Sequence, residues 1–182
     1  MKSTEQDLHL IETRIASERL FDGNLLHINC DTVRLPDGGQ ATREYVVHPG
    51  AVMVIPVLDD GRLLMERQYR YPLQQVFVEF PAGKLDAGED PLECGQRELL
   101  EETGYTAAQW EYLGVFHPLI SYSSEVIHFY LAKGLTAGKA RLDDEEFLEV
   151  ISMTVDELKS GILENRITDS KTIAGLFWLM NK

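Results

Sequence analysis

The sequence predicts an α/β fold in which a mixed β-sheet lies between helices. Three observations lead to this prediction. Residues 51–58 are nearly all apolar, as in a strand that is covered on both faces. Further strand-like runs occur on both sides of one strongly marked helix, residues 91–103. The chain then closes with helical patterns at 155–162 and 170–180, so that strands and helices contribute to one domain.

Composition describes a globular chain with an acidic surface. The 182 residues are 44% hydrophobic and 26% charged, and 30 acidic against 17 basic residues give a net charge of −13. Such a chain is long enough for one domain with a sizeable core. The negative field disfavours nucleic acid and anionic membranes as partners. A phosphorylated substrate would therefore require bound cations and local arginines.

The compartment is predicted from two absences. The N-terminal residues form no apolar signal region, and no window approaches the length of a membrane span. Cys30 and Cys94 are too few for a disulfide framework and suit a reducing compartment. We therefore expect a cytoplasmic protein.

Residues 1–47 are predicted to form a small antiparallel β segment ahead of a domain at 48–182. Turn sequences at 22–24 and 36–39 separate strand-like runs, and apolar and polar residues alternate from Leu26 to Asp31. A three-stranded piece of this kind has little core of its own. We expect it to pack on a second subunit; the alternative is an edge extension of the main sheet.

The larger domain begins with the apolar run at 51–58. A turn at 59–61 is predicted to make residues 62–71 the hairpin partner of this run. Other strands are expected at 76–80, 110–117, 126–132 and 148–153.

The helix at 91–103 has strong boundaries and an acidic face. Asp90 can cap it, Pro91 suits the first helical position, and Gly104 suits its end. Within it, Glu98 and Glu102 are four residues apart and stack on one face, with Glu101 beside them. A solvated acidic face is the alternative, but it leaves the glycine-rich loop ahead of the helix unexplained. A strand, such a loop and clustered carboxylates together indicate a site for a hard cation such as Mg²⁺.

These residues resemble the signature of the Nudix hydrolases, G-x5-E-x7-R-E-U-x-E-E-x-G-U, where U is apolar. The positions that match are Gly83, Glu89, Arg97, Glu98, Leu99, Glu101, Glu102, Gly104 and, loosely, Tyr105. The resemblance implies the α/β/α sandwich of that family. It also implies cleavage of a pyrophosphate bond, and the order of elements is similar to the ADP-ribose pyrophosphatase branch.

The resemblance also implies roles for the motif residues. Glu98 and Glu102 would bind a divalent metal, Mg²⁺ or alternatively Mn²⁺, with Glu101 as a weaker or shared ligand. The main-chain carbonyl of Ala82 would supply a further oxygen. Arg97 would orient these groups by pairing with Glu89 or with a metal ligand; a plain surface ion pair is the alternative.

The residue that activates water is expected outside the signature helix in this branch. The acidic loop at 142–147 stands in the corresponding place. We choose Glu146 as the base, with Asp144 and Glu145 as alternatives. An ordinary solvated loop would have the same composition.

Arginines ahead of the signature are expected to bind the diphosphate. Arg67 and Arg70 stand where this branch has them, and a guanidinium can bind phosphate through two parallel hydrogen bonds. Arg43 is a third candidate, donated across a dimer. The loop 118–125, which ends in Glu125, is expected to contact the sugar side of the substrate. It departs from the usual sequence of this branch at Ile120 and Ser121.

The function predicted from the sequence is therefore metal-dependent hydrolysis of a nucleoside diphosphate sugar, with ADP-ribose preferred. The alternatives are a GDP-mannose or other nucleotide-sugar hydrolase, a nucleoside triphosphate sanitiser and a non-catalytic nucleotide-sensing module. In the family, an N-terminal segment like residues 1–47 takes part in dimerisation, so a homodimer is expected.

Overall fold

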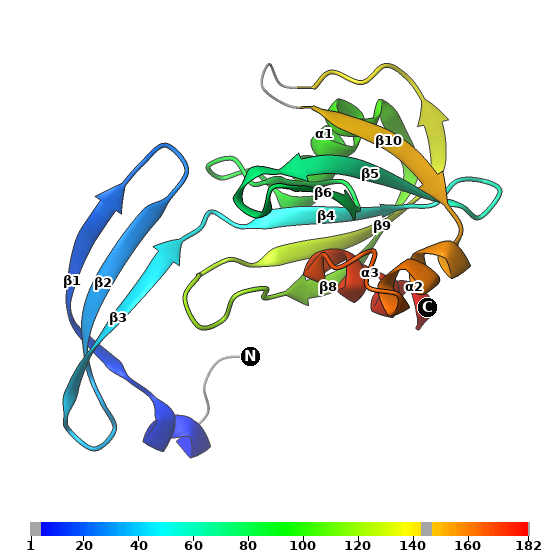
Figure 1. Cartoon of the computed structure of the whole chain (residues 1–182). Helices are drawn as coiled ribbons and strands as arrows, with labels where there is room; N and C mark the ends of the chain where they lie inside the picture. The colour runs from blue at the N-terminus through cyan, green and yellow to red at the C-terminus, as the bar shows by residue number, and fades with distance from the viewer. Residues whose placement is uncertain (1–4, 143–146, 182) are drawn as a thin grey trace. The chain divides into compact units, whose positions relative to one another are not determined.

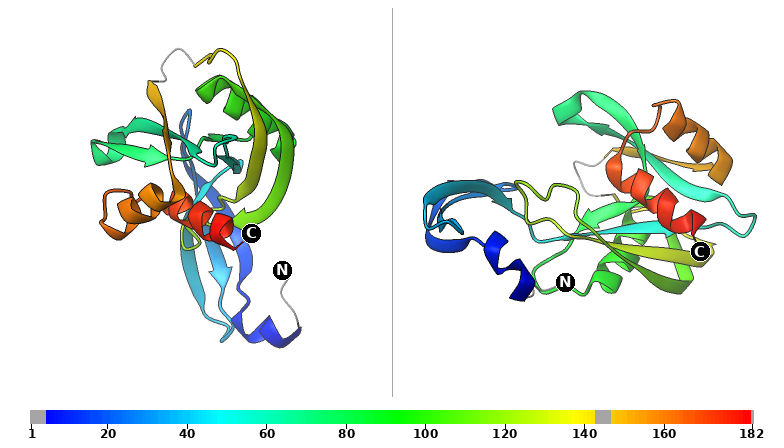
Figure 2. Two further views of the ribbon diagram at one scale, coloured as in Figure 1. Left: turned by 90° about the vertical axis from the view of Figure 1, so that its right-hand side faces the viewer. Right: turned by 90° about the horizontal axis from the view of Figure 1, so that it is seen from below.

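The computed structural model of the chain describes residues 5–142 and 147–181. They form two compact units. The first contains the N-terminal residues up to His48 together with Leu119–Glu125, and the second contains Pro49–Pro118 and the residues from Val126 onward. Figure 1 labels the elements of both units, and Figure 2 shows them from two further sides.

The first unit is an antiparallel β-sheet in the order β1-β2-β3. After a 3₁₀ segment at Glu5–Leu10 come β1 at Thr13–Asp22, β2 at His27–Arg34 and β3 at Gln40–Val47. The loop Leu119–Glu125 pairs with β3, because Val46 N–H donates to the Tyr122 carbonyl at 2.9 Å and Ser124 N–H donates back to the Val46 carbonyl at 3.0 Å. Every residue of β1 is exposed. The prediction of a small antiparallel β segment ahead of the larger domain is therefore confirmed.

The second unit contains a three-stranded and a four-stranded sheet. Their orders are β10-β5-β6 and β7-β4-β9-β8, and β4 pairs with β9 in parallel. The other pairings are antiparallel. The four-stranded sheet is therefore mixed, as predicted. The strands are β4 Ala51–Pro56, β5 Leu63–Arg70, β6 Gln75–Glu79, β7 Ala82–Lys84, β8 Tyr105–Phe116, β9 Ile127–Ala137 and β10 Leu148–Met153, with a 3₁₀ turn at Tyr71–Leu73 before β6.

The predicted hairpin of residues 51–58 with 62–71 is wrong. The turn exists, but β4 and β5 belong to different sheets, and an isolated bridge at the turn joins Leu63 to Val57, the residue after β4. β5 pairs instead with β6 and β10. Both faces of β4 are apolar, so the strand is best buried as an inner strand between β7 and β9.

The core lies on both faces of β4. One face packs under helix α1, Pro91–Thr103, where Val54 lies in a cluster with Leu99. The opposite face, which carries Met53, packs against the three-stranded sheet and two helices, α2 at Val155–Leu163 and α3 at Ser170–Met180. Figure 1 shows α1 and the pair α2 and α3 on opposite sides of β4 and β9. This arrangement confirms the predicted α/β/α sandwich.

The boundaries of α1 follow the sequence prediction. Asp90 caps the helix by accepting a hydrogen bond from Leu92 N–H at 2.8 Å, and Pro91 is the first helical residue. Gly104 ends it in the left-handed conformation, with φ +76°, and donates its N–H to the Leu100 carbonyl. Within the described ranges, no helix combines the length and hydrophobicity that a membrane span requires.

Candidate active site

The predicted metal-binding carboxylates on helix α1 lie against strand β7. Glu102 is only 4% exposed, and its Oε2 accepts a hydrogen bond from Ala82 N–H at 3.1 Å. Glu98 lies against Gly83: a Cβ atom added to this glycine would be 1.9 Å from the Glu98 carboxylate. The absence of a side chain at Gly83 therefore makes room for this carboxylate.

Arg97 connects the acidic residues of the motif. It makes two parallel hydrogen bonds to Glu89, from Nε to Oε1 at 2.9 Å and from Nη2 to Oε2 at 3.0 Å. Its Nη1 donates to Glu98 at 2.8 Å and to Glu101 at 3.1 Å, and Nη2 also reaches the Lys84 carbonyl at 3.2 Å. With 31% of its side chain exposed, Arg97 is a link between the loop and the helix rather than a plain surface ion pair.

These contacts change the acidity of the groups around Arg97. The guanidinium holds the pKa of Glu89 down to about 2, and the Asp86 N–H, which donates to the same carboxylate, adds to this effect. The carboxylates in turn raise the pKa of Arg97. Burial raises the pKa of the nearby Cys94 thiol to about 12. Glu89 and Arg97 therefore stay charged at neutral pH, and Cys94 stays protonated and unreactive.

The donor set fits a hard divalent cation that keeps substrate and water ligands. Glu98 and Glu102 offer carboxylate oxygens, and Gly83 leaves the space between loop and helix open to the Glu98 carboxylate. In residues 5–142 and 147–181, no three acidic, histidine or cysteine side chains converge on one point as a complete protein cage. Mg²⁺ binds through one or two carboxylates with waters and phosphate oxygens completing its shell, so two protein carboxylates suffice.

A second charged cluster surrounds Glu79 at the end of β6. Arg70 makes two parallel hydrogen bonds of 2.8 Å to the Glu79 carboxylate, whose side chain is 4% exposed. Lys171, at the start of α3, also donates to Glu79 and reaches Asp169 at 3.1 Å. The hydrogen bonds from Glu79 raise the pKa of Arg70, while Arg70 and Lys171 lower the pKa of Glu79 against its burial. Sequence reasoning identified Arg70 but missed Glu79, Lys171 and Asp169.

The structure does not bring Arg67 together with Arg70. The two residues are three apart on β5, so their side chains leave opposite faces of the strand. Arg67 donates to Glu149 of β10 at 2.6 Å, in a pair that is about half exposed on both sides.

The remaining predicted residues lie in the first unit or outside the described ranges. Arg43 forms an ion pair with Glu12, and its Nε donates at 2.9 Å. Glu125 lies 3.9 Å from the ring of His48. The predicted base Glu146 and its alternatives Asp144 and Glu145 are not among the described residues.

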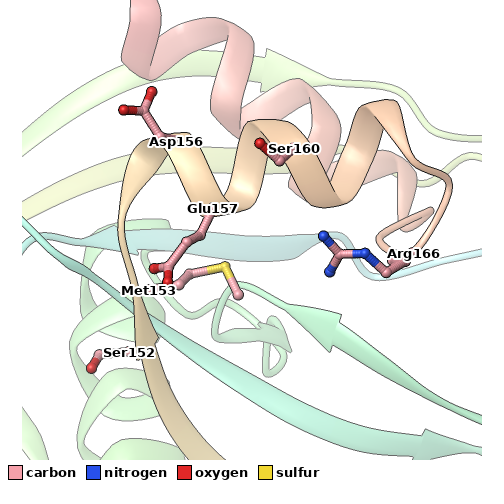
Figure 3. Close-up of a pocket in the computed structure, with 6 residues that line it drawn as sticks. All are labelled: Ser152, Met153, Asp156, Glu157, Ser160 and Arg166. Carbon is pink, nitrogen blue, oxygen red and sulfur yellow. The ribbon is translucent and has the colours of Figure 1, made fainter.

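Among the depressions lined by described residues are three whose linings can be compared with the predicted site residues. One of about 480 Å³ lies over the start of α2 (Figure 3) and contains none of the predicted site residues; Ser152, Met153, Asp156, Glu157, Ser160 and Arg166 line it. A second, of about 260 Å³, lies within the first unit between Arg43–Tyr45 and residues 120–124. The third, of about 160 Å³, is lined by the charged cluster around Glu79 together with Leu73 and Phe77. Of these three depressions, formed by the described residues, the third contains a predicted substrate-binding arginine, Arg70, next to the buried carboxylate of Glu79.

Comparison with known proteins supports the resemblance of this motif to the Nudix signature. The model of the NUDIX domain matches residues 47–175. This chain belongs to the Nudix family. A second model, the nucleoside diphosphate sugar hydrolase N-terminal domain, matches residues 12–46. The chain is accordingly a Nudix hydrolase, a class of enzymes that generally depends on a divalent metal.

Individual relatives match along most of their length. A methanol dehydrogenase activator from Bacillus methanolicus is 44% identical over 170 residues, which cover 92% of each chain. An ADP-ribose pyrophosphatase from Bacillus subtilis is 38% identical over 184 residues, covering 100% of this chain and 96% of the relative. A crystal structure of an ADP compounds hydrolase superposes with a TM-score of 0.83 over 93% of this chain and 92% of its own, at 22% identity. This last likeness supports the fold.

Proposed function

We propose that the protein hydrolyses the pyrophosphate bond of a nucleoside diphosphate sugar, with ADP-ribose preferred, and uses Mg²⁺ as its cation. The observation that carries the proposal is that Glu102 accepts a hydrogen bond from Ala82 N–H, while Glu98 lies against Gly83 and is held by Arg97. Two relatives named ADP-ribose pyrophosphatase, at 38% and 37% identity, support the substrate, as does the match of residues 12–46.

Each part of the site has a task in this reaction. Glu98 and Glu102, with the Ala82 carbonyl, would hold the cation, and Glu101 would be a weaker or shared ligand. A bound divalent cation offsets the charge of the diphosphate and acidifies the attacking water. Arg97 keeps the carboxylates in place through its hydrogen bonds to Glu89, Glu98 and Glu101.

The diphosphate itself would be bound by arginine. Arg70 is 43% exposed and lines a depression, so its guanidinium is accessible to phosphate oxygens. Arg67 and Arg43 remain proposed contacts, and Glu125 is the proposed contact on the sugar side. Glu146 would accept a proton from the attacking water, with Asp144 and Glu145 as alternatives. The water oxygen joins one phosphorus, the bridging P–O bond breaks, and ADP-ribose gives AMP and ribose 5-phosphate.

A turnover screen tests the proposed substrate. Purified protein with Mg²⁺ is incubated with ADP-ribose, GDP-mannose, other nucleotide sugars and nucleoside triphosphates, and the phosphate products are measured. The proposal expects the highest kcat/KM for ADP-ribose. A preference for triphosphates, or no turnover with Mg²⁺ or Mn²⁺, would reject it in favour of a sanitiser or a non-catalytic nucleotide-sensing module.

We further propose that residues 1–47 assemble a homodimer and that residues 48–182 form the hydrolase domain. All of β1 is exposed, including Ile15, Leu20 and Phe21 at 45%, 49% and 54%. Such an apolar strand is suited to burial against a second copy. Light scattering at micromolar concentration should give the mass of a dimer, and a monomer would overturn this part. Both cysteines are free thiols, which suits a reducing compartment such as the cytoplasm.

A second candidate role follows from one comparison. The relative named methanol dehydrogenase activator has higher identity, 44%, than the pyrophosphatases reported above. The chain would then stimulate a methanol dehydrogenase. Adding it to such an enzyme with Mg²⁺ should raise the dehydrogenase rate, and an unchanged rate would argue against this role.

A further inference from the structure

We propose that Lys171 is a positioning residue for the diphosphate-binding arginine. Lys171 neutralises the buried carboxylate of Glu79, so that the guanidinium of Arg70 can turn from Glu79 to the substrate. The inference rests on the proposed function, because it assigns a task to Lys171 in binding the diphosphate.

The geometry places two cations on one buried carboxylate. Arg70 holds Glu79 from β5 through two hydrogen bonds of 2.8 Å. Lys171 reaches the same Oε2 from α3, and the two contacting residues are 92 positions apart in the sequence. The Glu79 side chain is 4% exposed and that of Lys171 is 14% exposed, whereas that of Arg70 is 43% exposed. Of the two cations, Arg70 is therefore the more accessible to a ligand.

A buried carboxylate needs a cation whatever the state of the substrate. If Glu79 had only Arg70, releasing the guanidinium to a phosphate would leave an uncompensated charge in the protein interior, which is strongly unfavourable. With Lys171 in place, the carboxylate keeps a charged partner. The cost of turning Arg70 towards the diphosphate falls accordingly.

Lys171 is itself firmly held. Asp169 accepts hydrogen bonds from Lys171 Nζ at 3.1 Å and, as the cap of α3, from Thr172 N–H at 2.9 Å. The Thr172 hydroxyl accepts from Phe80 N–H at 3.1 Å, which joins the helix start to the residue after Glu79. This network ends two residues before Ala82, so it supports the start of β7, where the proposed metal site lies.

The depression beside the cluster gives the substrate access. Arg70, Glu79, Asp169 and Lys171 line it, and its volume is about 160 Å³. Two carboxylates and two cations balance there while Arg70 holds Glu79, so the depression attracts no anion strongly in this arrangement. An anion becomes favourable when Arg70 leaves the carboxylate to Lys171. The diphosphate thus gains a guanidinium partner, and the buried carboxylate of Glu79 keeps Lys171 as its charged partner.

The test compares Lys171→Met with Lys159→Met, a control on the exposed surface of α2. Binding of inorganic pyrophosphate in the presence of Mg²⁺ is measured by calorimetry, and KM and kcat are measured with ADP-ribose. Lys171→Met should weaken pyrophosphate binding and raise KM by roughly 10- to 100-fold, the value of one charge-assisted hydrogen bond, with a much smaller change in kcat. Lys159→Met should stay within twofold of the wild type.

The Glu79→Gln background distinguishes positioning from a structural role. Without the negative charge at Glu79, adding Lys171→Met should change pyrophosphate affinity by less than twofold. An equal loss in both backgrounds, or wild-type affinity in Lys171→Met, would overturn the inference. If Lys171→Met alone does not fold, the double variant compared with Glu79→Gln decides, since it removes both charges together. Failure of the proposed substrate would show separately, as absent ADP-ribose turnover by a wild type that still binds pyrophosphate.

Discussion

Replacing Gly83 by alanine should disable the metal site while leaving the fold nearly intact. The new Cβ would lie 1.9 Å from both the carbon and Oε1 of the Glu98 carboxylate. Ordinary van der Waals contact begins near 3.4 Å, so the carboxylate must move by about 1.5 Å. A displacement of this size takes the Glu98 carboxylate out of its place in the proposed metal site.

The cost to stability should be small because the displaced atoms end a flexible side chain. The move breaks the 2.8 Å hydrogen bond from Arg97, and Arg97 keeps its bonds to Glu89. For a partly exposed pair this amounts to about 1 kcal/mol or less. Misplacing a catalytic group by ~1 Å can cost about 10²-fold in rate. We therefore expect kcat/KM to fall by roughly 100-fold with a melting temperature within a few degrees of the wild type.

Gly61→Ala is a suitable control. Gly61 lies in the turn after β4, has φ +83°, and has open space around its would-be Cβ. Alanine there should cost roughly 1–2 kcal/mol of backbone strain and leave activity unchanged. Thermal melts, Mg²⁺ titration and initial rates are measured for both variants. Wild-type Mg²⁺ affinity and rate in Gly83→Ala would refute the idea that Glu98 must lie against this glycine.

Three further outcomes are expected. Glu146→Gln should lower kcat by roughly 10²–10⁴-fold, the contribution of a positioned base, and leave Mg²⁺ affinity unchanged. If Glu146→Gln keeps near-wild-type kcat while Glu145→Gln or Asp144→Asn loses it, the base is that other residue of the loop. Because the folded pKa of Glu89 is depressed to about 2 from 4.5, its ion pair stabilises the fold above pH 4.5, and this contribution is lost as the pH falls from there towards 2. Urea unfolding between pH 2 and 6 should show that Glu89→Gln flattens this dependence, and equal slopes in both proteins would contradict it. Deleting residues 1–47 should abolish the dimer, and a soluble, active dimer in gel filtration would exclude the proposed interface.

The sequence was most informative where structure is local. The helix start at Asp90, its end at Gly104 and the stacking of Glu98 with Glu102 all depend on residues within one helix or its caps. The glycine at position 83 could be recognised from the motif spacing. Its reason, close contact with Glu98, required the folded chain.

Contacts between residues far apart in the sequence could not be predicted in the same way. The turn after β4 indicated a hairpin, but whether β5 pairs with β4 or with β10 depends on which surfaces remain to be covered. Lys171 and Glu79 lie 92 residues apart, so their ion pair could not be predicted from local sequence. The local sign of a buried ion pair was the charged residue Glu79 within an apolar strand. The strand pattern does separate Arg67 from Arg70, since residues three apart leave opposite faces.

The central claim is that Glu98 and Glu102 bind the catalytic cation. Its most direct test is the rate of ADP-ribose hydrolysis as a function of Mg²⁺ concentration, measured side by side for the wild type and Glu102→Gln. The amide keeps the shape of the side chain and removes one ligand charge, so half-maximal activation should shift to higher Mg²⁺, and excess Mg²⁺ should restore part of the rate. Normal hydrolysis by Glu102→Gln at limiting Mg²⁺ would contradict the metal site on which the account depends.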